Sequence, residues 1–68
     1  MDNFIRVKEF ATNHEYVINT NNIAAIQDIG KQSSIIISTG KSIIVDYEQS
    51  DLIKMLGIIH YLDLRIKG

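Results

Sequence analysis

The chain contains the stretch SIIISTGKSIIV at residues 34–45, and this pattern predicts a β-hairpin. Isoleucine and valine dominate both ends of this stretch, and such β-branched side chains favour strands because they pack well on a pleated sheet. The polar segment between them contains Gly40, which can adopt the positive φ that a tight turn requires. The three consecutive isoleucines, Ile35–Ile37, indicate a strand buried on both faces, with a helix covering one face and a partner as the candidate for the other.

The residues before this hairpin contain three further strand-like segments. Residues 4–11 and 15–19 are rich in apolar residues and are separated by Thr12-Asn13, a turn signal. Residues 23–29 place their isoleucines three apart, which fits a helical turn as well as a bulged strand. The short length of this segment and the polar turns on both sides favour the strand. We therefore expect about five antiparallel strands.

The C-terminal part of the chain has a different period. From Leu52 onward the apolar side chains recur three and four residues apart, at Leu52, Met55, Ile59, Leu62 and Ile66. This spacing predicts a helix over residues 50 to about 65, with Asp46 or Ser50 as its N-cap. Gly57 leaves an alternative open, because glycine is the commonest C-terminal cap and residues 60–67 then alternate strictly, as in a sixth strand.

These elements together predict a single small domain over residues 1–68, of the α+β class and mainly β. The strands of residues 4–46 form a small curled sheet or partial barrel, and the C-terminal helix packs on one face or opening. A chain of 68 residues lies near the lower limit for folding alone.

The composition favours self-association as an additional source of stability. The chain has no cysteine, so disulfides and thiolate metal sites are excluded, and its two histidines, His14 and His60, lack the spacing of metal ligands. We therefore expect no metal and no cofactor. A hydrophobic content of 46% is high for so small an interior, so we expect a homo-oligomer, a dimer or larger.

The charge and hydropathy patterns bear on location. The formal net charge of −1 gives no general attraction to nucleic acid or to anionic membranes. The N-terminus lacks the long apolar run of a signal peptide, and no stretch approaches the roughly 20 apolar residues of a membrane span. A soluble cytoplasmic protein is the expectation.

The first predicted strand carries a candidate binding face. Its alternation places four side chains on one face, with basic groups between aromatic rings: Phe4, Arg6, Lys8 and Phe10. Single-stranded nucleic acid is bound by such combinations through base stacking and phosphate contacts. The structural alternative, which we favour, is that the rings pack at the core edge or at a subunit contact while the basic stems cover them.

The predicted helix carries a candidate oligomer interface. Its stripe of Leu52, Met55, Ile59, Leu62 and Ile66 has the spacing with which two helices pack. Packing of the same stripe against the sheet of its own chain is the alternative. A membrane-surface role is disfavoured because the basic residues of this segment form no stripe.

No catalytic motif is present in the sequence, so we expect no catalytic residues and no enzyme activity. The glycines are isolated, which excludes a glycine-rich phosphate loop, and no serine lies in a nucleophile motif. The nearby carboxylates Asp46 and Glu48 are more typical of a helix start or a solvated surface than of acid–base catalysis.

The middle of the chain resembles a family of small bacterial proteins typified by the flagellar protein FlbD. The resemblance spans Phe4 to Gly57 and rests on Glu15-Tyr16-Val17-Ile18-Asn19, Ile23 and Ile26, Ile35–Ile37, Thr39-Gly40-Lys41, Ile44-Val45, and Ser50 before an apolar helix. The family pattern is a short strand ending in Asn, an isoleucine pair, a hairpin with a TGK-like turn, and a helix after a serine. The resemblance implies a non-enzymatic accessory or regulatory protein, and it brings no catalytic residues with it.

We therefore expect a non-enzymatic, self-associating interaction module that acts as an accessory or regulatory protein through protein–protein contacts. One alternative is a nucleic-acid or small-ligand binding module that uses the first-strand face. Another is an inhibitor protein of a phage or mobile element, which the small size permits although no particular residue argues for it.

Overall fold

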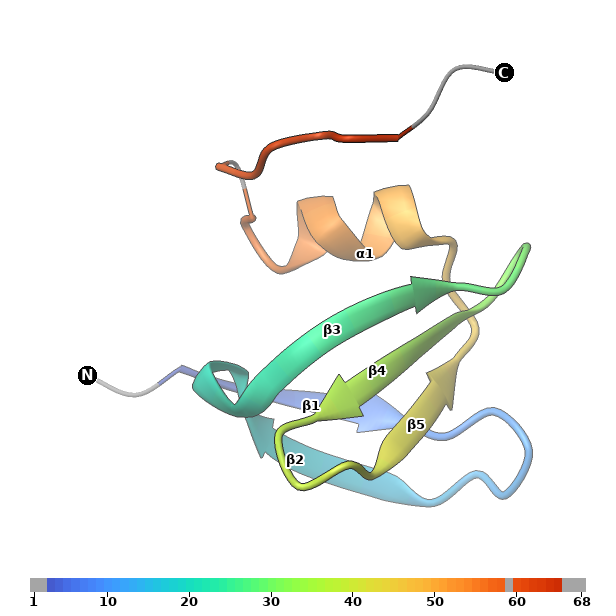
Figure 1. Cartoon of the computed structure of the whole chain (residues 1–68). Helices are drawn as coiled ribbons and strands as arrows, with labels where there is room; N and C mark the ends of the chain where they lie inside the picture. Colours follow the sequence, from blue (N-terminus) through green and yellow to red (C-terminus); the bar gives the residue numbers. More distant parts are fainter. Residues whose placement is uncertain (1–2, 59, 66–68) are drawn as a thin grey trace.

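The computed structural model describes residues 3–58 and 60–65 and contains five strands and one α-helix (Figure 1). In chain order the elements are β1 (Phe4–Lys8), β2 (Glu15–Asn19), the short 3-10 helix η1 (Thr20–Asn22), β3 (Ile23–Asp28), β4 (Ser33–Ile37), β5 (Ser42–Val45) and α1 (Gln49–Met55). The predicted class, mainly β with antiparallel strands and a C-terminal helix, is confirmed.

The strands form two antiparallel sheets, β1-β2 and β3-β4-β5. In the second sheet β4 is central and pairs Ile35 with Ile26 on one side and with Ile43 on the other. A bulge between Ile23 and Ala25 interrupts the β3–β4 register. This bulge explains how a segment with isoleucines three residues apart forms a strand, since the extra residue resets the alternation of side chains.

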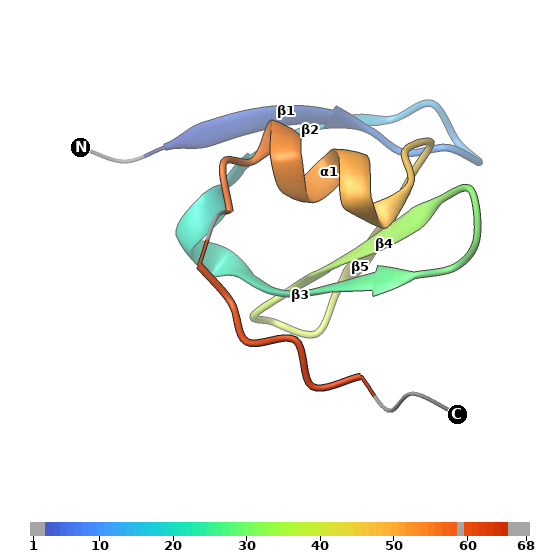
Figure 2. The ribbon, with the colours of Figure 1, turned by 90° about the horizontal axis from the view of Figure 1, so that it is seen from above.

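One backbone hydrogen bond connects β5 to the end of the first hairpin: the N–H of Phe10, just past β1, donates to the carbonyl of Ile44 at 2.8 Å. The sheets therefore curl toward each other without closing into a barrel, and α1 lies across the space between them (Figures 1 and 2).

The predicted hairpin of residues 34–45 is confirmed. Gly40 has φ +96°, and its N–H donates to the Ile37 carbonyl at 2.8 Å. A side chain at this φ would be strained, so the turn depends on glycine.

The core lies between the three-stranded sheet, the β1-β2 hairpin and α1. Its most buried apolar side chains are Ile35, Ile43, Val45 and Leu52. Around them pack the partly buried Val7, Tyr16, Ile18, Ile23, Ile26, Ile37 and Leu56. Strand β4 is buried at Ser33–Ile35 and half-buried at Ile36 and Ile37, so its interior position is as the isoleucine run predicts.

The predicted helix over residues 50 to about 65 is wrong in its length, since α1 ends at Met55. Gly57 has φ +72°, and the N–H groups of Gly57 and Ile58 donate to the carbonyls of Lys54 and Ile53, both at 3.1 Å. These two bonds form a glycine-capped helix end of the Schellman type, which is the alternative that the sequence left open.

Two further points differ from the sequence analysis. Residues 60–65, the described part of the tail, adopt neither helix nor strand, so the sixth strand that the sequence left open as an alternative is not formed there. At the start of the helix the N-cap position is Glu48, without a side-chain cap, in place of Asp46 or Ser50.

Candidate functional site

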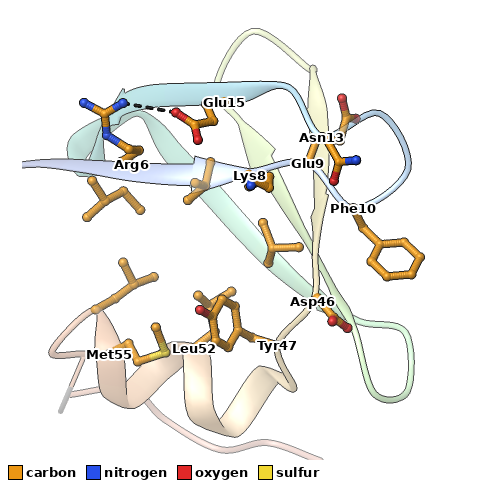
Figure 3. Close-up of a pocket in the computed structure, with 14 residues that line it drawn as sticks. Arg6, Lys8, Glu9, Phe10, Asn13, Glu15, Asp46, Tyr47, Leu52 and Met55 are labelled. Carbon is orange, nitrogen blue, oxygen red and sulfur yellow. Dashed lines mark hydrogen bonds and ion pairs between the residues drawn. The ribbon is translucent and has the colours of Figure 1, made fainter.

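A groove of about 780 Å³ lies between β1 and α1 (Figure 3). Its lining comes from β1 and the turn after it, from Glu15 of β2, from the end of β5 and the residues after it, and from the face of α1 that carries Leu52 and Met55. The backbone hydrogen bond between the two sheets joins Phe10 to Ile44, at the end of the groove where Figure 3 places Phe10.

The walls of the groove are apolar. Alternation along β1 turns Ile5 and Val7 inward, where both are half-buried. On the opposite side the groove reaches Val45, Leu52 and Leu56. Such a lining favours an apolar ligand surface, because burying apolar groups there removes them from water.

Three large side chains of the groove remain open to solvent. Phe10 is 51% exposed, Tyr47 is 48% exposed and Met55 is 60% exposed. Tyr47 and Met55 lie on the helix side, and Phe10 lies at one end of the groove (Figure 3). Exposed aromatic and methionine side chains are the types most enriched at protein interfaces.

The rim of the groove carries both signs of charge. The Arg6 guanidinium donates a hydrogen bond to the Glu15 carboxylate at 3.2 Å, and both side chains are at least half exposed. Lys8, Glu9 and Asp46 complete the charged part of the rim. An exposed pair of this kind contributes about 0–1 kcal/mol, so it can be exchanged for another partner at little cost.

The predicted first-strand face is brought together only in part. β1 ends at Lys8, and Phe10 lies in the turn that follows. Arg6, Lys8 and Phe10 line the groove, and Phe4 is 58% exposed near the start of the strand. The ion pair of Arg6 with Glu15 partly neutralises the basic character that nucleic-acid binding needs.

The predicted helix stripe is not assembled on one helix. Leu52 is 3% exposed and belongs to the core, whereas Met55 is exposed at the last turn of α1. Leu62 is 79% exposed and lies in the tail beyond the helix. Ile59 and Ile66 lie outside the described residues. A role for these residues in an oligomer interface stays a prediction.

Two side-chain contacts that position α1 were not anticipated from the sequence. The buried Ser33 hydroxyl donates to the Tyr47 carbonyl at 2.8 Å, and the Gln49 amide donates to the Ile26 carbonyl at 2.8 Å. These bonds hold the start of the helix against β3 and β4, and so set the width of the groove. Serine and glutamine are common in loops and strands alike, and nothing in their local pattern marks such contacts.

The tail contains an ion pair whose electrostatics are resolved. Arg65 donates to both carboxylate oxygens of Asp63, with a shortest distance of 2.7 Å. These hydrogen bonds hold the pKa of Asp63 below its usual range and raise the pKa of Arg65.

The described part of the chain contains neither a membrane-spanning helix nor a cluster of metal-ligating side chains. No helix there has the length and apolarity to cross a bilayer. No group of three or more His, Cys, Asp or Glu side chains is placed to hold a metal ion within residues 3–58 and 60–65.

Comparisons of this chain with models of protein families, with curated proteins and with solved structures gave no match. The likeness to the flagellar FlbD family therefore stays a hypothesis based on the residues quoted above.

Proposed function

We propose that the protein is a non-enzymatic, self-associating interaction module that acts as an accessory or regulatory protein through protein–protein contacts. One observation carries the proposal: the groove between β1 and α1 is apolar inside and exposes Phe10, Tyr47 and Met55 around it. A monomer gains nothing from exposing such side chains, whereas an interface buries them.

The magnitude of this burial shows that the groove needs help from other surfaces. Fully burying a large apolar side chain contributes about 1.5–3 kcal/mol, so three half-exposed ones contribute about 2–4 kcal/mol together. A micromolar complex requires about 8 kcal/mol. Further apolar side chains must therefore join the interface, and the most exposed ones of the described chain are in the tail, Leu62 at 79% and Leu64 at 77%.

The charge of the groove rim supports a protein partner over a polyanion. Glu9, Glu15 and Asp46 lie around the same opening as Arg6 and Lys8. A nucleic-acid site needs an excess of positive charge to release counterions, whereas protein interfaces pair charges of both signs.

A nucleic-acid or small-ligand binding role is the second candidate, and the exposure of the Phe4 and Phe10 rings favours it. The ultraviolet spectrum of freshly purified protein tests it, because the chain has three tyrosines and no tryptophan. Co-purified nucleotide raises the absorbance at the nucleotide maximum above that of the tyrosines. A spectrum of tyrosine alone, with no retention of mixed single strands at low salt, rules this candidate out.

The molar mass in solution tests self-association directly. Light scattering at two protein concentrations about a hundredfold apart should give a mass that rises toward a dimer or larger, by mass action, or is already oligomeric at both. The mass of a 7.7 kDa monomer at both concentrations overturns the proposal.

A further inference from the structure

Strand β1 has an edge with unused backbone hydrogen-bonding groups. Glu9 N–H donates to the His14 carbonyl and Thr20 N–H donates to the Asn3 carbonyl, so the backbone groups of the odd-numbered residues are the ones that hydrogen-bond to β2. The N–H and C=O groups of Phe4, Arg6 and Lys8 therefore point to the opposite edge. Within the described residues none of these groups has a backbone partner.

This edge borders the groove. β1 lies between β2 and the groove, and α1 forms the far wall (Figure 3). An extended peptide laid along β1 would therefore gain backbone hydrogen bonds on one side and apolar contacts on the other, as in strand addition to an exposed sheet edge.

The tail has the alternating pattern of a strand but pairs with no strand among residues 3–58 and 60–65. In residues 60–65 Leu62 and Leu64 alternate with Tyr61, Asp63 and Arg65. Such alternation is typical of a half-buried strand, yet both leucines are more than three-quarters exposed and the segment has no regular structure.

We propose that residues 60–65 of one copy add as an antiparallel strand to the free edge of β1 in a second copy, and that the second copy returns the same contact. This inference rests on the proposed self-association and names its mode. A reciprocal exchange gives a two-fold symmetric dimer in which each tail fills the groove of the partner.

The register follows from charge. Placing Asp63 opposite Arg6 sets an acid against a base and puts Arg65 opposite the Phe4 ring, a favourable cation–aromatic contact. A shift of two residues that sets Asp63 opposite Lys8 puts Arg65 opposite Arg6, and like charges directly across a strand pair are destabilising.

In the same register the apolar side chains meet. Leu64 lies opposite Ile5 and Leu62 lies opposite Val7, on the face of β1 that turns toward the groove. The two leucines add about 3–6 kcal/mol of burial to the contribution of each groove. The reciprocal exchange makes this contact twice, so the gross gain is about 10–20 kcal/mol, from which association subtracts about 4–15 kcal/mol.

A second copy fits this contact better than the tail of the same chain. The tail leaves α1 on the side of β3, whereas β1 lies on the other side of the helix (Figure 2). The tail of a partner reaches the groove without crossing the helix.

The test begins with the dimer dissociation constant of the full chain and of Leu62→Asp/Leu64→Asp, measured by sedimentation equilibrium. Both leucines are exposed in the monomer, so the variant keeps its fold, and we expect the dissociation constant to rise by about a hundredfold or more. Ile29→Asp is the matched control, because Ile29 is an exposed apolar residue in the turn after β3, and it should leave the constant unchanged.

A charge exchange tests the register. Arg6→Glu should weaken the dimer, and adding Asp63→Arg to it should restore most of the lost affinity, because the acid–base pair is then re-formed in reverse. Failure of the second change to restore affinity overturns the proposed contact.

Hydrogen exchange of the unaltered protein gives a readout that depends on no variant. The Arg6 and Lys8 amides, which point away from β2, should exchange fast in dilute protein and become protected in the dimer, while the Val7 amide is protected in both. An oligomer that leaves the Arg6 and Lys8 amides unprotected, or that is indifferent to Leu62→Asp/Leu64→Asp, overturns tail exchange and leaves self-association standing. A monomer at every concentration overturns both.

Discussion

Leu52 is the side chain by which α1 is attached to the core, and its truncation gives the sharpest test of the packing. It is 3% exposed and is the one residue of α1 that is fully buried, against Ile35, Ile43 and Val45. Leu→Ala in a core costs about 2–5 kcal/mol, from lost transfer energy and from the cavity that remains. Because Leu52 also lines the groove, water can enter part of the space left, and we expect a loss of about 2–3 kcal/mol.

This loss is large for so small a chain. At about 0.05–0.15 kcal/mol per residue, a domain of this length has a free energy of unfolding of about 3–10 kcal/mol. Leu52→Ala should therefore lower the urea midpoint strongly, as followed by far-ultraviolet circular dichroism at one protein concentration, with the slope unchanged. Lys54→Ala is the control: Lys54 is an exposed residue of the same helix that does not line the groove, so the change should alter the free energy by about 0.5 kcal/mol or less.

A loss of less than about 1 kcal/mol for Leu52→Ala, below the range for a buried leucine, would contradict this packing. An equal loss for Lys54→Ala would contradict it too, since the helix would then be held by a different face.

Three further predictions concern single groups. Ser33→Ala should cost about 1–2 kcal/mol in urea unfolding, because it leaves the Tyr47 carbonyl without its donor, and an unchanged midpoint contradicts the role of this bond. Gly57→Ala should lower the free energy of unfolding by about 1 kcal/mol through backbone strain at φ +72°, and not through a clash, because no atom lies within 4 Å of the added Cβ. Gly57→Asn should lower it less, because asparagine tolerates this conformation. Equal losses for the two variants would contradict the role of the positive φ. In a carboxyl-resolved NMR titration the pKa of Asp63 should lie below its usual range, and it should rise in Arg65→Gln. The ion pair is complete above the ordinary aspartate pKa and is lost as the pH falls through the lowered pKa. An Asp63 pKa that Arg65→Gln leaves unchanged would contradict the pair. Because Asp63 is fully exposed, we expect no measurable change in stability from this pair.

The strands could be predicted from the sequence because their signals are local. Gly40 marks the turn of the last hairpin, and the run Ile35–Ile37 marks the central strand. The strand at Ile23–Asp28 was the ambiguous case, and the bulge between Ile23 and Ala25 is what reconciles its three-residue spacing with an extended backbone.

The length of the helix could not be predicted because two periods overlap in the C-terminal part. The spacing of Leu52, Met55 and Leu62 satisfies a helix, while the strict alternation of residues 60–65 satisfies a strand. The positive φ of Gly57 decides between them locally, since it turns the chain out of the helix regardless of the apolar pattern that follows.

Only the β1 wall of the groove could be predicted from the sequence. Alternation along the first strand identified Arg6 and Lys8 as neighbours on an exposed face, and both line the groove. The opposite wall depends on where α1 docks, which is set by the contacts of Ser33 and Gln49 with distant backbone carbonyls. Such long-range contacts leave no local trace in the sequence.

The order of the strands has a consequence for how the chain folds as it is synthesised. Each sheet pairs strands that follow one another in sequence, so every pairing closes a short loop at a small cost in entropy. The β1-β2 hairpin can pair as soon as it leaves the ribosome, but an isolated hairpin is marginal in water. Its apolar face stays uncovered until Val45 and Leu52 have been synthesised, so the nascent chain gains most of its stability only after β5 and α1 have been added.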